Sequence, residues 1–350
     1  MFKRFNRFFS KDIGIDLGTA NTLVYLRGQG VVINEPSVVA VNKKTGRVVA
    51  IGNEAKRMVG RTPGHIVAIR PLVDGVISDF EVTEEMLAYF IRKVHKDTSR
   101  FFARSRVVIG VPSGITNVEI RAVRDATYNA GAREVHIVEE PMAAAIGARL
   151  AVHDPVGNMI IDVGGGTTDI AVISLGGIVT SKNLRIAGDK LNQDIINYAR
   201  DEFKILLGEK TAEDVKIAIG SVSKSSDGLE ATIRGRDLIS GLPREVTVTD
   251  TDIREAIIKS IRALIRATKE AIEETPPELV ADIMHRGIIL VGGGSFLKGL
   301  SSLIESEVKI PVHVAEDPLT AVVRGTGHIL EDLPLYEDIL LQHEDDIPPK

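Results

Sequence analysis

Asp16-Leu17-Gly18-Thr19-Ala20-Asn21-Thr22 and Asp162-Val163-Gly164-Gly165-Gly166-Thr167-Thr168-Asp169 are the two stretches that decide the fold, and the second begins 146 positions after the first. Each follows a short apolar run rich in β-branched residues and precedes another. A strand, a tight glycine-containing turn and a second strand form a β-hairpin. Two hairpins of the same design, each entered by an aspartate, predict a duplicated fold.

The chemistry of both turns suits the phosphates of a nucleotide. Glycine lets the backbone approach a phosphate closely, and small polar side chains add hydrogen-bond donors. We therefore predict that two segments hold the β- and γ-phosphates of one nucleoside triphosphate: Gly18, Thr19, Ala20 and Asn21 in the first, and Gly164, Gly165, Gly166 and Thr167 in the second. Asp16 and Asp162 are expected to face the accompanying Mg²⁺ through its bound waters. Either turn taken alone is also compatible with an ordinary hairpin.

The composition is that of an ordinary globular protein with about two domains. The chain has 350 residues, of which 44% are hydrophobic and 26% charged, and about two cores are expected at this length. It contains no cysteine, which excludes disulfides and thiolate metal sites. No apolar run approaches the roughly 18 residues that span a bilayer. A net charge of −5 argues against a general nucleic-acid binder.

Phenylalanine is concentrated at the N-terminus. Four of the ten phenylalanines are interleaved there with lysine and arginine: Phe2, Phe5, Phe8 and Phe9. On a helix these rings gather on one face and the cations line the other, which predicts a short amphipathic helix bound to anionic lipid. A disordered start and a helix packed on its own domain are the alternatives. Phe101 and Phe102 form a second candidate membrane contact, for which burial in the core is the alternative.

The remaining pattern divides the chain into two similar halves. Strands and amphipathic helices alternate in each half, which predicts central sheets covered by helices. We expect a membrane-binding segment at 1–11, a first domain at 12–150 with a small insertion at about 34–79, a second domain at 151–333 with a small insertion at about 187–250, and a flexible acidic tail at 334–350.

Caps and prolines predict where several helices begin and end. Thr83 is expected to cap a helix that runs to about residue 95, and Thr211 to open a capping box for a helix that ends near residue 219. Pro276 ends an amphipathic helix that starts at about residue 251. The Glu139-Glu140-Pro141 segment is expected to follow a strand and to open an alanine-rich helix.

Taken together, these motifs resemble the actin/Hsp70/sugar-kinase superfamily, and the resemblance covers nearly the whole chain. The glycine turns alone identify only the superfamily. Five stretches are similar to the MreB family of bacterial actin-like cell-shape proteins: 16–22 (DLGTANT), 34–40 (NEPSVVA), 60–64 (GRTPG), 139–147 (EEPMAAAIG) and 162–168 (DVGGGTT). The resemblance implies an α/β, actin-like ATPase fold, in which two duplicated mixed-sheet domains with small inserted subdomains surround a nucleotide cleft.

The resemblance also implies roles for individual residues. Glu140 is expected to orient the water that attacks the γ-phosphate, assisted by Thr167, and the adjacent Glu139 is the alternative that only caps the helix. The adenosine is expected between two segments: Glu213, Asp214, Val215 and Lys216 on a helix, and Gly292, Gly293, Gly294, Ser295 and Phe296 in a turn. By spacing, Glu213 and Lys216 share one helix face, where a surface ion pair is the alternative.

The function implied is that of a weak ATPase that binds ATP and Mg²⁺ and assembles into filaments, with paired protofilaments, on the inner face of the cell membrane. Its partners would be copies of itself, anionic lipid and membrane proteins of the elongation machinery. The filament would organise peptidoglycan synthesis and set rod shape, and no nucleic-acid partner is expected.

Two other activities of the superfamily are rivals to this function. A chaperone ATPase requires a downstream substrate-binding domain, and we expect none in this chain of 350 residues. A small-molecule kinase could use the same phosphate turns with Glu140 as its base. Nothing in a kinase, however, calls for the phenylalanine-rich start.

Overall fold

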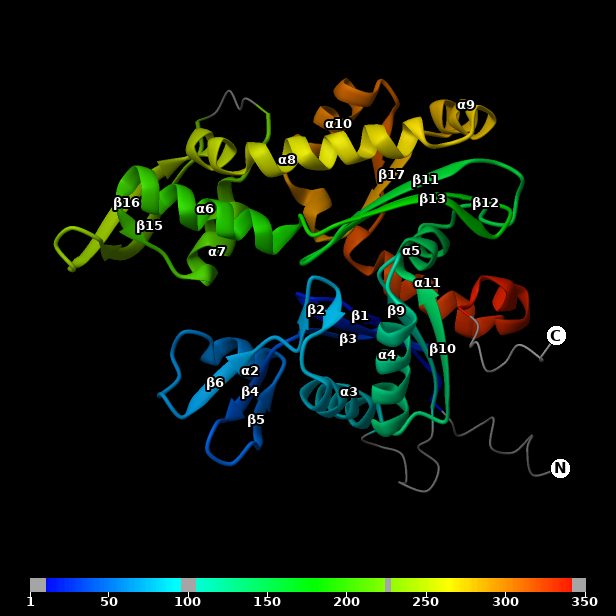
Figure 1. Ribbon diagram of the computed structural model, residues 1–350, viewed down its shortest axis with the longest axis horizontal. Coiled ribbons are helices and arrows are strands. Elements are labelled where there is room, and N and C mark those ends of the chain that lie inside the picture. Colours follow the sequence, from blue (N-terminus) through cyan, green and yellow to red (C-terminus); the bar gives the residue numbers. More distant parts are fainter. Residues whose placement is uncertain (1–10, 96–104, 224–227, 342–350) are drawn as a thin grey trace. The chain divides into compact units, whose positions relative to one another are not determined.

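The computed structural model describes residues 11–95, 105–223 and 228–341, and the chain forms two compact units (Figure 1). The first unit comprises Met1–Val156, Ile173–Ser181 and Leu319–Lys350, and the second comprises Gly157–Val172 and Lys182–Pro318. This division differs from the predicted second domain of 151–333, because residues 151–156, 173–181 and those from 319 onward belong to the first unit.

A five-stranded sheet forms the centre of the first unit, with strand order β10-β9-β1-β2-β3. β1 (Ile13–Leu17), β2 (Asn21–Leu26) and β3 (Gly30–Pro36) are successive antiparallel strands. β9 (Arg106–Val111) pairs in parallel with β1, and β10 (Glu134–Glu139) pairs in parallel with β9. The first predicted hairpin is therefore confirmed as β1 and β2, with the Gly18 turn at its tip.

Helices pack on both faces of this sheet, because β1 is buried on both. Ile13 and Ile15 belong to one buried cluster with side chains of α3 (Phe80–Val94) and α4 (Asn117–Asn129). Successive residues of a strand face opposite sides. Gly14 accordingly faces the other side, where it lies against Thr326 of α11.

Two helices of the first unit pack unusually closely, and this explains why the C-terminal segment belongs there. α5 (Glu140–Gly147) and α11 (Ala321–Glu331) each carry a glycine at their contact. A Cβ on Gly147 would collide with the backbone at Ala321, and a Cβ on Gly325 would collide with the backbone at Ala143. The expectation that residues 319–333 form part of the second domain was wrong, because this contact joins residues far apart in sequence.

The small insertion of the first unit begins after β3, which itself belongs to the main sheet, and it contains a three-stranded antiparallel sheet of order β5-β4-β6. A helix and a two-stranded hairpin complete it. Its elements are β4 (Val39–Asn42), β5 (Val48–Ile51), α2 (Asn53–Met58), β6 (Ile66–Ile69), β7 (Leu72–Val73) and β8 (Val76–Ile77).

The second main sheet repeats the first, with strand order β13-β12-β11-β17-β18. The predicted hairpin is confirmed as β11 (Asn158–Val163) and β12 (Thr168–Ser174), followed by β13 (Gly177–Leu184). On its other side β11 pairs in parallel with β17 (Ile288–Val291), which pairs in parallel with β18 (Val312–Val314). Both sheets therefore place a three-strand run beside two parallel strands, which confirms the duplication.

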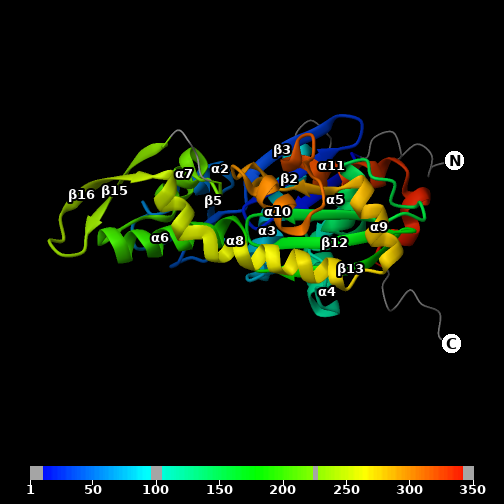
Figure 2. The same ribbon diagram turned by 90° about the horizontal axis from the view of Figure 1, so that it is seen from above.

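A large apolar core in the second unit joins its sheet to amphipathic helices and a smaller sheet. Figure 2 shows the β15–β16 hairpin and α7 at the opposite end of this unit from α9. The elements are α6 (Gly188–Phe203), β14 (Ile205–Leu206), α7 (Glu209–Ile219), β15 (Glu230–Asp237), β16 (Pro243–Thr249), α8 (Asp250–Glu273), α9 (Pro277–Arg286), the 3-10 helix η2 (Gly293–Phe296) and α10 (Leu300–Val308).

Several predicted helix starts and the tail need correction. α3 begins at Phe80 because the Asp79 side chain accepts a hydrogen bond from the Val82 N–H, so Thr83 is not its cap. α7 begins at Glu209 after Gly208 and has no side-chain cap, so the capping box at Thr211 was wrong. The start of the predicted flexible tail forms the 3-10 helix η4 (Leu333–Ile339), in which Ile339 is buried. Residues 342–350 lie outside the described residues.

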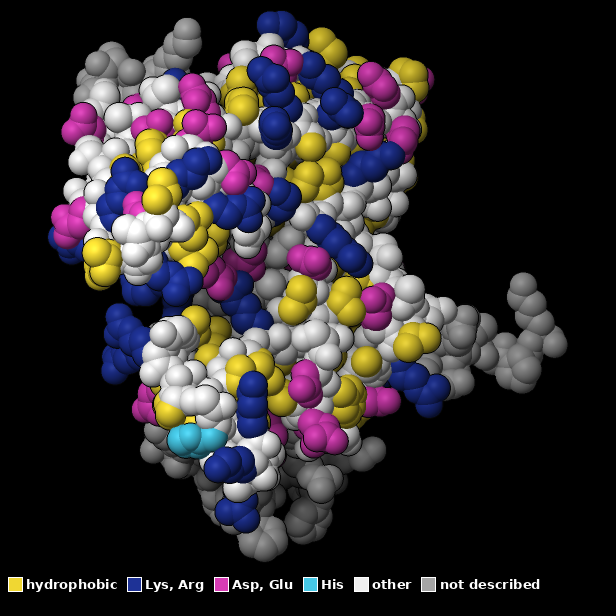
Figure 3. Space-filling model, turned by 60° about the vertical axis from the view of Figure 1, so that its left-hand side comes forward, with side chains coloured by type: hydrophobic (Ala, Val, Ile, Leu, Met, Phe, Trp, Pro, Cys, Tyr) yellow, Lys and Arg dark blue, Asp and Glu magenta, His cyan; other side chains and the backbone are white. Residues whose placement is uncertain are grey.

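The surface is mixed in charge. On the face drawn in Figure 3, Lys and Arg side chains are interspersed with Asp and Glu side chains. Within the described ranges, no helix is long and apolar enough to cross a bilayer.

Candidate functional site

The first glycine turn joins β1 to β2 and is tightly closed. A Cβ on Gly18 would lie 2.7 Å from the Asn21 carbonyl oxygen, so a larger residue would push the turn open. The Thr19 side chain is buried, and its hydroxyl accepts a hydrogen bond from the Gly75 N–H at 3.1 Å. Gly75 lies in the turn between β7 and β8. Sequence reasoning missed this contact, because no local pattern links residues 19 and 75.

Asp16 and Glu140 both lie beside Gly110 of β9. Asp16 is the register partner of Gly110 across the parallel β1–β9 pair. A Cβ on Gly110 would lie 3.4 Å from Cγ of Glu140, the first residue of α5. The glycine therefore leaves room for the Glu140 side chain near the carboxyl end of β1. The structure thus brings together the predicted metal-facing and water-orienting residues of the first unit.

Glu139 and Glu140 differ in local structure, although both are half-buried. Glu139 is the last residue of β10, where it pairs with Val111, and it is the N-cap residue of α5 without a side-chain cap bond. Glu140 starts the helix, and Pro141 fits the first turn because its missing N–H has no helical partner there. The alternative that Glu139 caps α5 with its side chain is therefore not supported.

Asp16 has an unusual acidity. Loss of solvation by burial raises the pKa of its carboxyl group from 3.8 to about 7. A divalent cation and its waters would favour the ionised form, because opposite charge lowers a carboxyl pKa. Below pH 7 the cation and a proton should therefore compete for Asp16.

We expect binding of magnesium–ATP to release close to one proton per molecule at pH 6 and almost none at pH 8.5, because Asp16 is already ionised at the higher pH. Calorimetry in two buffers of different ionisation enthalpy measures the released protons. Asp16→Asn should remove the difference between the two pH values. Equal proton release by the wild type at both pH values would contradict the assignment.

The second glycine turn is closed by a hydrogen bond from the Gly164 N–H to the Thr167 carbonyl at 2.9 Å. Asp162 precedes it at the end of β11 and is 8% exposed. Gly292 has a φ of +78° and lies so close that a Cβ there would collide with Asp162 Oδ1. Only glycine fits this position easily, because other residues rarely adopt positive φ. The structure thus brings the predicted Gly292 turn against the second phosphate turn.

α7 supplies one polar side chain to the same region. Lys216 Nζ donates to the Gly188 carbonyl at 2.8 Å, and Gly188 N–H in turn donates to the Gly164 carbonyl at 3.2 Å. Its predicted neighbours diverge: Val215 is buried in the core, and Asp214 is exposed and forms an ion pair with Lys210. Lys216 therefore lies beside the second turn, and Glu213, three residues earlier on α7, is half-buried.

The predicted adenosine turn forms the 3-10 helix η2. Its Ser295 hydroxyl donates to the Gly292 carbonyl at 2.7 Å, which stabilises the turn rather than leaving the hydroxyl for a ligand. A Cβ on Gly294 would collide with the Val163 side chain, so this glycine also brings η2 close to β11. Phe296 is 60% exposed and offers an apolar surface beside the turn.

The residues present fit a magnesium nucleotide held mainly by backbone groups. Across residues 11–95, 105–223 and 228–341, no group of three or more Asp, Glu and His side chains could hold a metal ion. Magnesium needs no such group, because it keeps several waters and binds through one or two carboxylates together with phosphates. Each unit taken by itself offers donors of this kind: a glycine turn at residue 18 with the carboxylate of Asp16 in the first unit, and a glycine turn at residue 164 with the carboxylate of Asp162 in the second.

The candidate membrane residues lie outside the described residues. They are Phe2, Phe5, Phe8, Phe9, Phe101 and Phe102. Their predicted role therefore stays a prediction.

Duplicated five-stranded sheets, each carrying an aspartate-entered glycine turn, define an actin-like protein. The chain belongs to the MreB/Mbl protein family, whose model matches residues 10–338. It is 52% identical to the cell shape-determining protein Mbl of Bacillus subtilis over 325 residues, which cover 93% of this chain and 97% of Mbl. It is 50% identical to the cell shape-determining protein MreB of Escherichia coli over 349 residues, which cover 98% of this chain and all of that protein.

Solved structures of one further relative have the same fold. MreB5 of Spiroplasma citri bound to ADP matches with a TM-score of 0.88 at 39% identity, over 94% of this chain and 98% of MreB5. The same protein bound to AMPPNP, an ATP analogue, matches with a TM-score of 0.87. The family prediction and the actin-like fold prediction are therefore confirmed.

Proposed function

We propose that this protein is an ATP-dependent cytoskeletal filament protein that lies on the inner face of the cell membrane and determines rod shape. The observation that carries the proposal is the pair of closed glycine turns, each entered by an aspartate. Binding of ADP and AMPPNP by MreB5 supports nucleotide binding here, and the cell-shape role of Mbl and MreB supports the cytoskeletal assignment.

The proposed chemistry is hydrolysis of ATP to ADP and phosphate. Backbone N–H groups of the two turns bind the β- and γ-phosphates, and Asp16 and Asp162 hold the water shell of Mg²⁺, which neutralises phosphate charge when it is bound. Glu140 orients the attacking water and accepts its proton late in the reaction. Thr167, whose side chain is buried beside Gly164, assists in holding that water.

Assembly is the proposed consequence of nucleotide binding. A nucleotide that binds one conformation of an actin-like protein more tightly than another shifts the population of protein molecules toward that conformation. Head-to-tail contacts between copies that do not close into a ring generate a filament. We propose paired protofilaments that recruit membrane proteins of the elongation machinery and thereby organise peptidoglycan synthesis.

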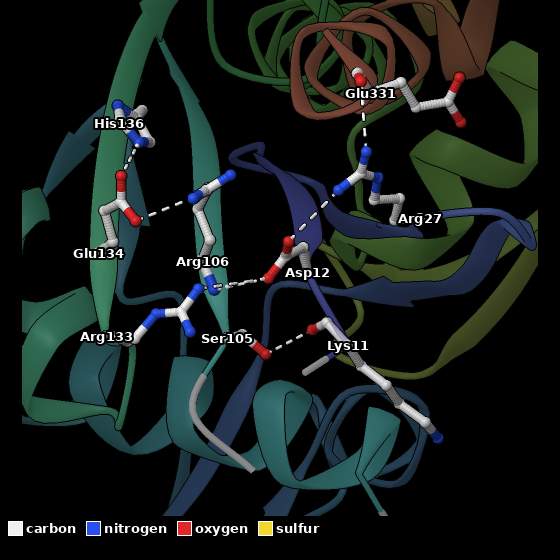
Figure 4. Close-up of polar contacts among 9 residues, drawn as sticks. All are labelled: Lys11, Asp12, Arg27, Ser105, Arg106, Arg133, Glu134, His136 and Glu331. Atoms are coloured by element: carbon white, nitrogen blue, oxygen red, sulfur yellow. Dashed lines mark hydrogen bonds and ion pairs between the residues drawn. The ribbon is translucent and has the colours of Figure 1, made fainter. Parts of the chain in front are cut away.

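Contacts between the residues that border the two candidate membrane segments support membrane association. Ser105 hydroxyl donates to the Lys11 carbonyl at 2.5 Å (Figure 4). His95 Nε2 lies 2.7 Å from the same hydroxyl. Lys11, His95 and Ser105, the described residues that border segments 1–10 and 96–104, therefore lie together. Two segments that contain apolar and basic residues and start close together can bind the same area of an anionic membrane. Two linked contacts bind more stably than one.

Changing Phe2 and Phe5 to Ser is expected to weaken binding to anionic vesicles at least about tenfold and to leave ATP affinity unchanged. Each buried ring contributes a few kcal/mol of transfer free energy, and neither residue belongs to a phosphate turn. Vesicle co-sedimentation measures the binding. Ile239→Ser is the matched control, because Ile239 is 84% exposed and also apolar.

Unchanged co-sedimentation of the double variant would remove the N-terminal segment from the membrane contact. The Phe101→Ser, Phe102→Ser variant would then be tested alone.

A small-molecule kinase of the same superfamily is the second candidate, because Glu140 could act as base toward an acceptor hydroxyl. The two functions separate experimentally. Light scattering should rise when ATP and Mg²⁺ are added to the purified protein alone, and ATP consumption should not increase when mixed metabolites are added. A kinase would give the reverse result.

A further inference from the structure

We propose that Ser37 is a positioning residue for the first phosphate turn. It fixes the turn so that the backbone N–H groups of the turn point away from Ser37. The inference rests on the proposed ATP binding and names a residue that acts through the turn rather than on the nucleotide. Ser37 follows β3 and is fully buried, with 0% of its surface exposed.

Ser37 makes hydrogen bonds with three residues of the turn. Its hydroxyl donates to the Gly18 carbonyl at 2.5 Å, and its backbone N–H donates to the Ala20 carbonyl at 3.0 Å. Its hydroxyl oxygen also lies 2.9 Å from Thr22 Oγ1. A serine hydroxyl has one proton, which is used at Gly18. The Thr22 hydroxyl is therefore the donor of the third bond, and the chain of donors runs from Thr22 through Ser37 to Gly18.

The direction of these bonds determines where the turn can bind a ligand. In a planar trans peptide the carbonyl and the N–H point in opposite directions. A Gly18 carbonyl held toward Ser37 therefore directs the Thr19 N–H away from Ser37, and an Ala20 carbonyl held there does the same for the Asn21 N–H. Two N–H groups with one common direction form the kind of concavity that binds anions.

The second turn shows the same arrangement with different donors. Gly188 N–H donates to the Gly164 carbonyl at 3.2 Å, and Asp189 N–H donates to the Gly165 carbonyl at 2.8 Å. These donors belong to the first turn of α6. Each turn thus has two carbonyls held by the segment that follows its third strand. The second half uses two backbone donors, whereas the first uses one backbone donor and the Ser37 hydroxyl.

This difference makes the first turn testable by a single substitution. Ser37→Ala removes the donor to Gly18 while it keeps the backbone bond to Ala20 and nearly the same volume. The orientation of the peptide between Gly18 and Thr19 is then no longer fixed by Ser37. Gly18 does not fix it either, because glycine tolerates a wide range of backbone angles. The N–H donor of Thr19 should then no longer be oriented toward a phosphate in advance, whereas contacts to the base and ribose should remain.

The test compares affinities of the full chain for ATP and AMP by calorimetry, with Mg²⁺ present. Ser37→Ala is expected to weaken ATP binding about tenfold, as loss of one oriented donor to a charged group does, and to change AMP binding less than twofold. Thr22→Val is the matched control. It removes a buried hydroxyl from the same chain of bonds but leaves the Ser37–Gly18 bond, so ATP affinity should stay within about twofold.

Three results would overturn the proposal. They are unchanged ATP affinity in Ser37→Ala, equal losses for ATP and AMP, and an equal loss of ATP affinity in Thr22→Val. Equal losses for ATP and AMP would indicate a structural role, which thermal unfolding of the same samples would register. Failure of the wild type to bind ATP would instead contradict the proposed function itself.

Discussion

Glu140→Ala is expected to slow ATP hydrolysis about 10²–10⁴-fold and to leave ATP affinity nearly unchanged. Loss of a general base or of a group that positions water has an effect of this size. Glu140 begins α5 beside Gly110, the register partner of Asp16, so its side chain extends from a point near the end of the strand that precedes the first turn. A carboxylate repels phosphate, so its removal should not weaken binding.

Single-turnover phosphate release and ATP affinity should be measured on the same preparation of this variant. Glu139→Ala is the matched control, because it removes the neighbouring carboxylate from the end of β10 and should retain hydrolysis within about threefold. Filaments of Glu140→Ala should persist longer, since their ATP is not consumed. Phosphate release at the wild-type rate would remove Glu140 from the mechanism, and lost ATP binding would indicate a structural role.

Asp162→Ala is expected to lower the magnesium-dependent part of ATP affinity by roughly 10–100-fold, the range typical of groups that act on a metal through its water shell. Asp162 ends β11 directly before the second turn and is almost fully buried against Gly292. Without the Asp162 carboxylate, no fixed negative group remains at this position to orient the waters of the Mg²⁺ that accompanies the phosphates.

A magnesium titration of ATP binding measures this effect. Asp162→Asn keeps the shape of the side chain and should show most of the same loss, because the amide lacks the charge. The comparison of the two variants separates charge from packing beside Gly292. An unchanged magnesium dependence in both variants would contradict the assignment of Asp162.

The hairpins could be predicted from the sequence because their determinants are local. Glycines and small polar residues between two β-branched runs specify a turn within a few residues, and the structure has both hairpins at the expected places. Local signals also predicted that the Glu139-Glu140-Pro141 segment opens a helix, and the helix begins at Glu140.

Other features could not be predicted because they depend on contacts between distant residues. Thr83 resembled an N-cap, but Asp79 competes for the same helix and its side chain forms the capping bond. α11 joins the first unit through the close approach at Gly147 and Gly325, which no local pattern indicates.

The candidate site shows the same limit. The turns were found from composition, whereas their supports at Ser37, Gly75 and Gly110 come from other elements of the fold. The family resemblance placed Asp214 and Val215 beside the ligand together with Lys216, but Val215 is buried in the core and Asp214 forms an ion pair with Lys210. A helix presents successive residues on different faces, so only part of a contiguous stretch can reach one ligand.

Electron microscopy of the purified full chain on anionic vesicles tests the central claim most directly, with ATP and Mg²⁺ in one sample and no nucleotide in the other. The account predicts membrane-bound filaments, arranged in pairs, only in the sample with ATP and Mg²⁺. A protein that binds and hydrolyses ATP but stays unassembled on and off the vesicles would contradict the account.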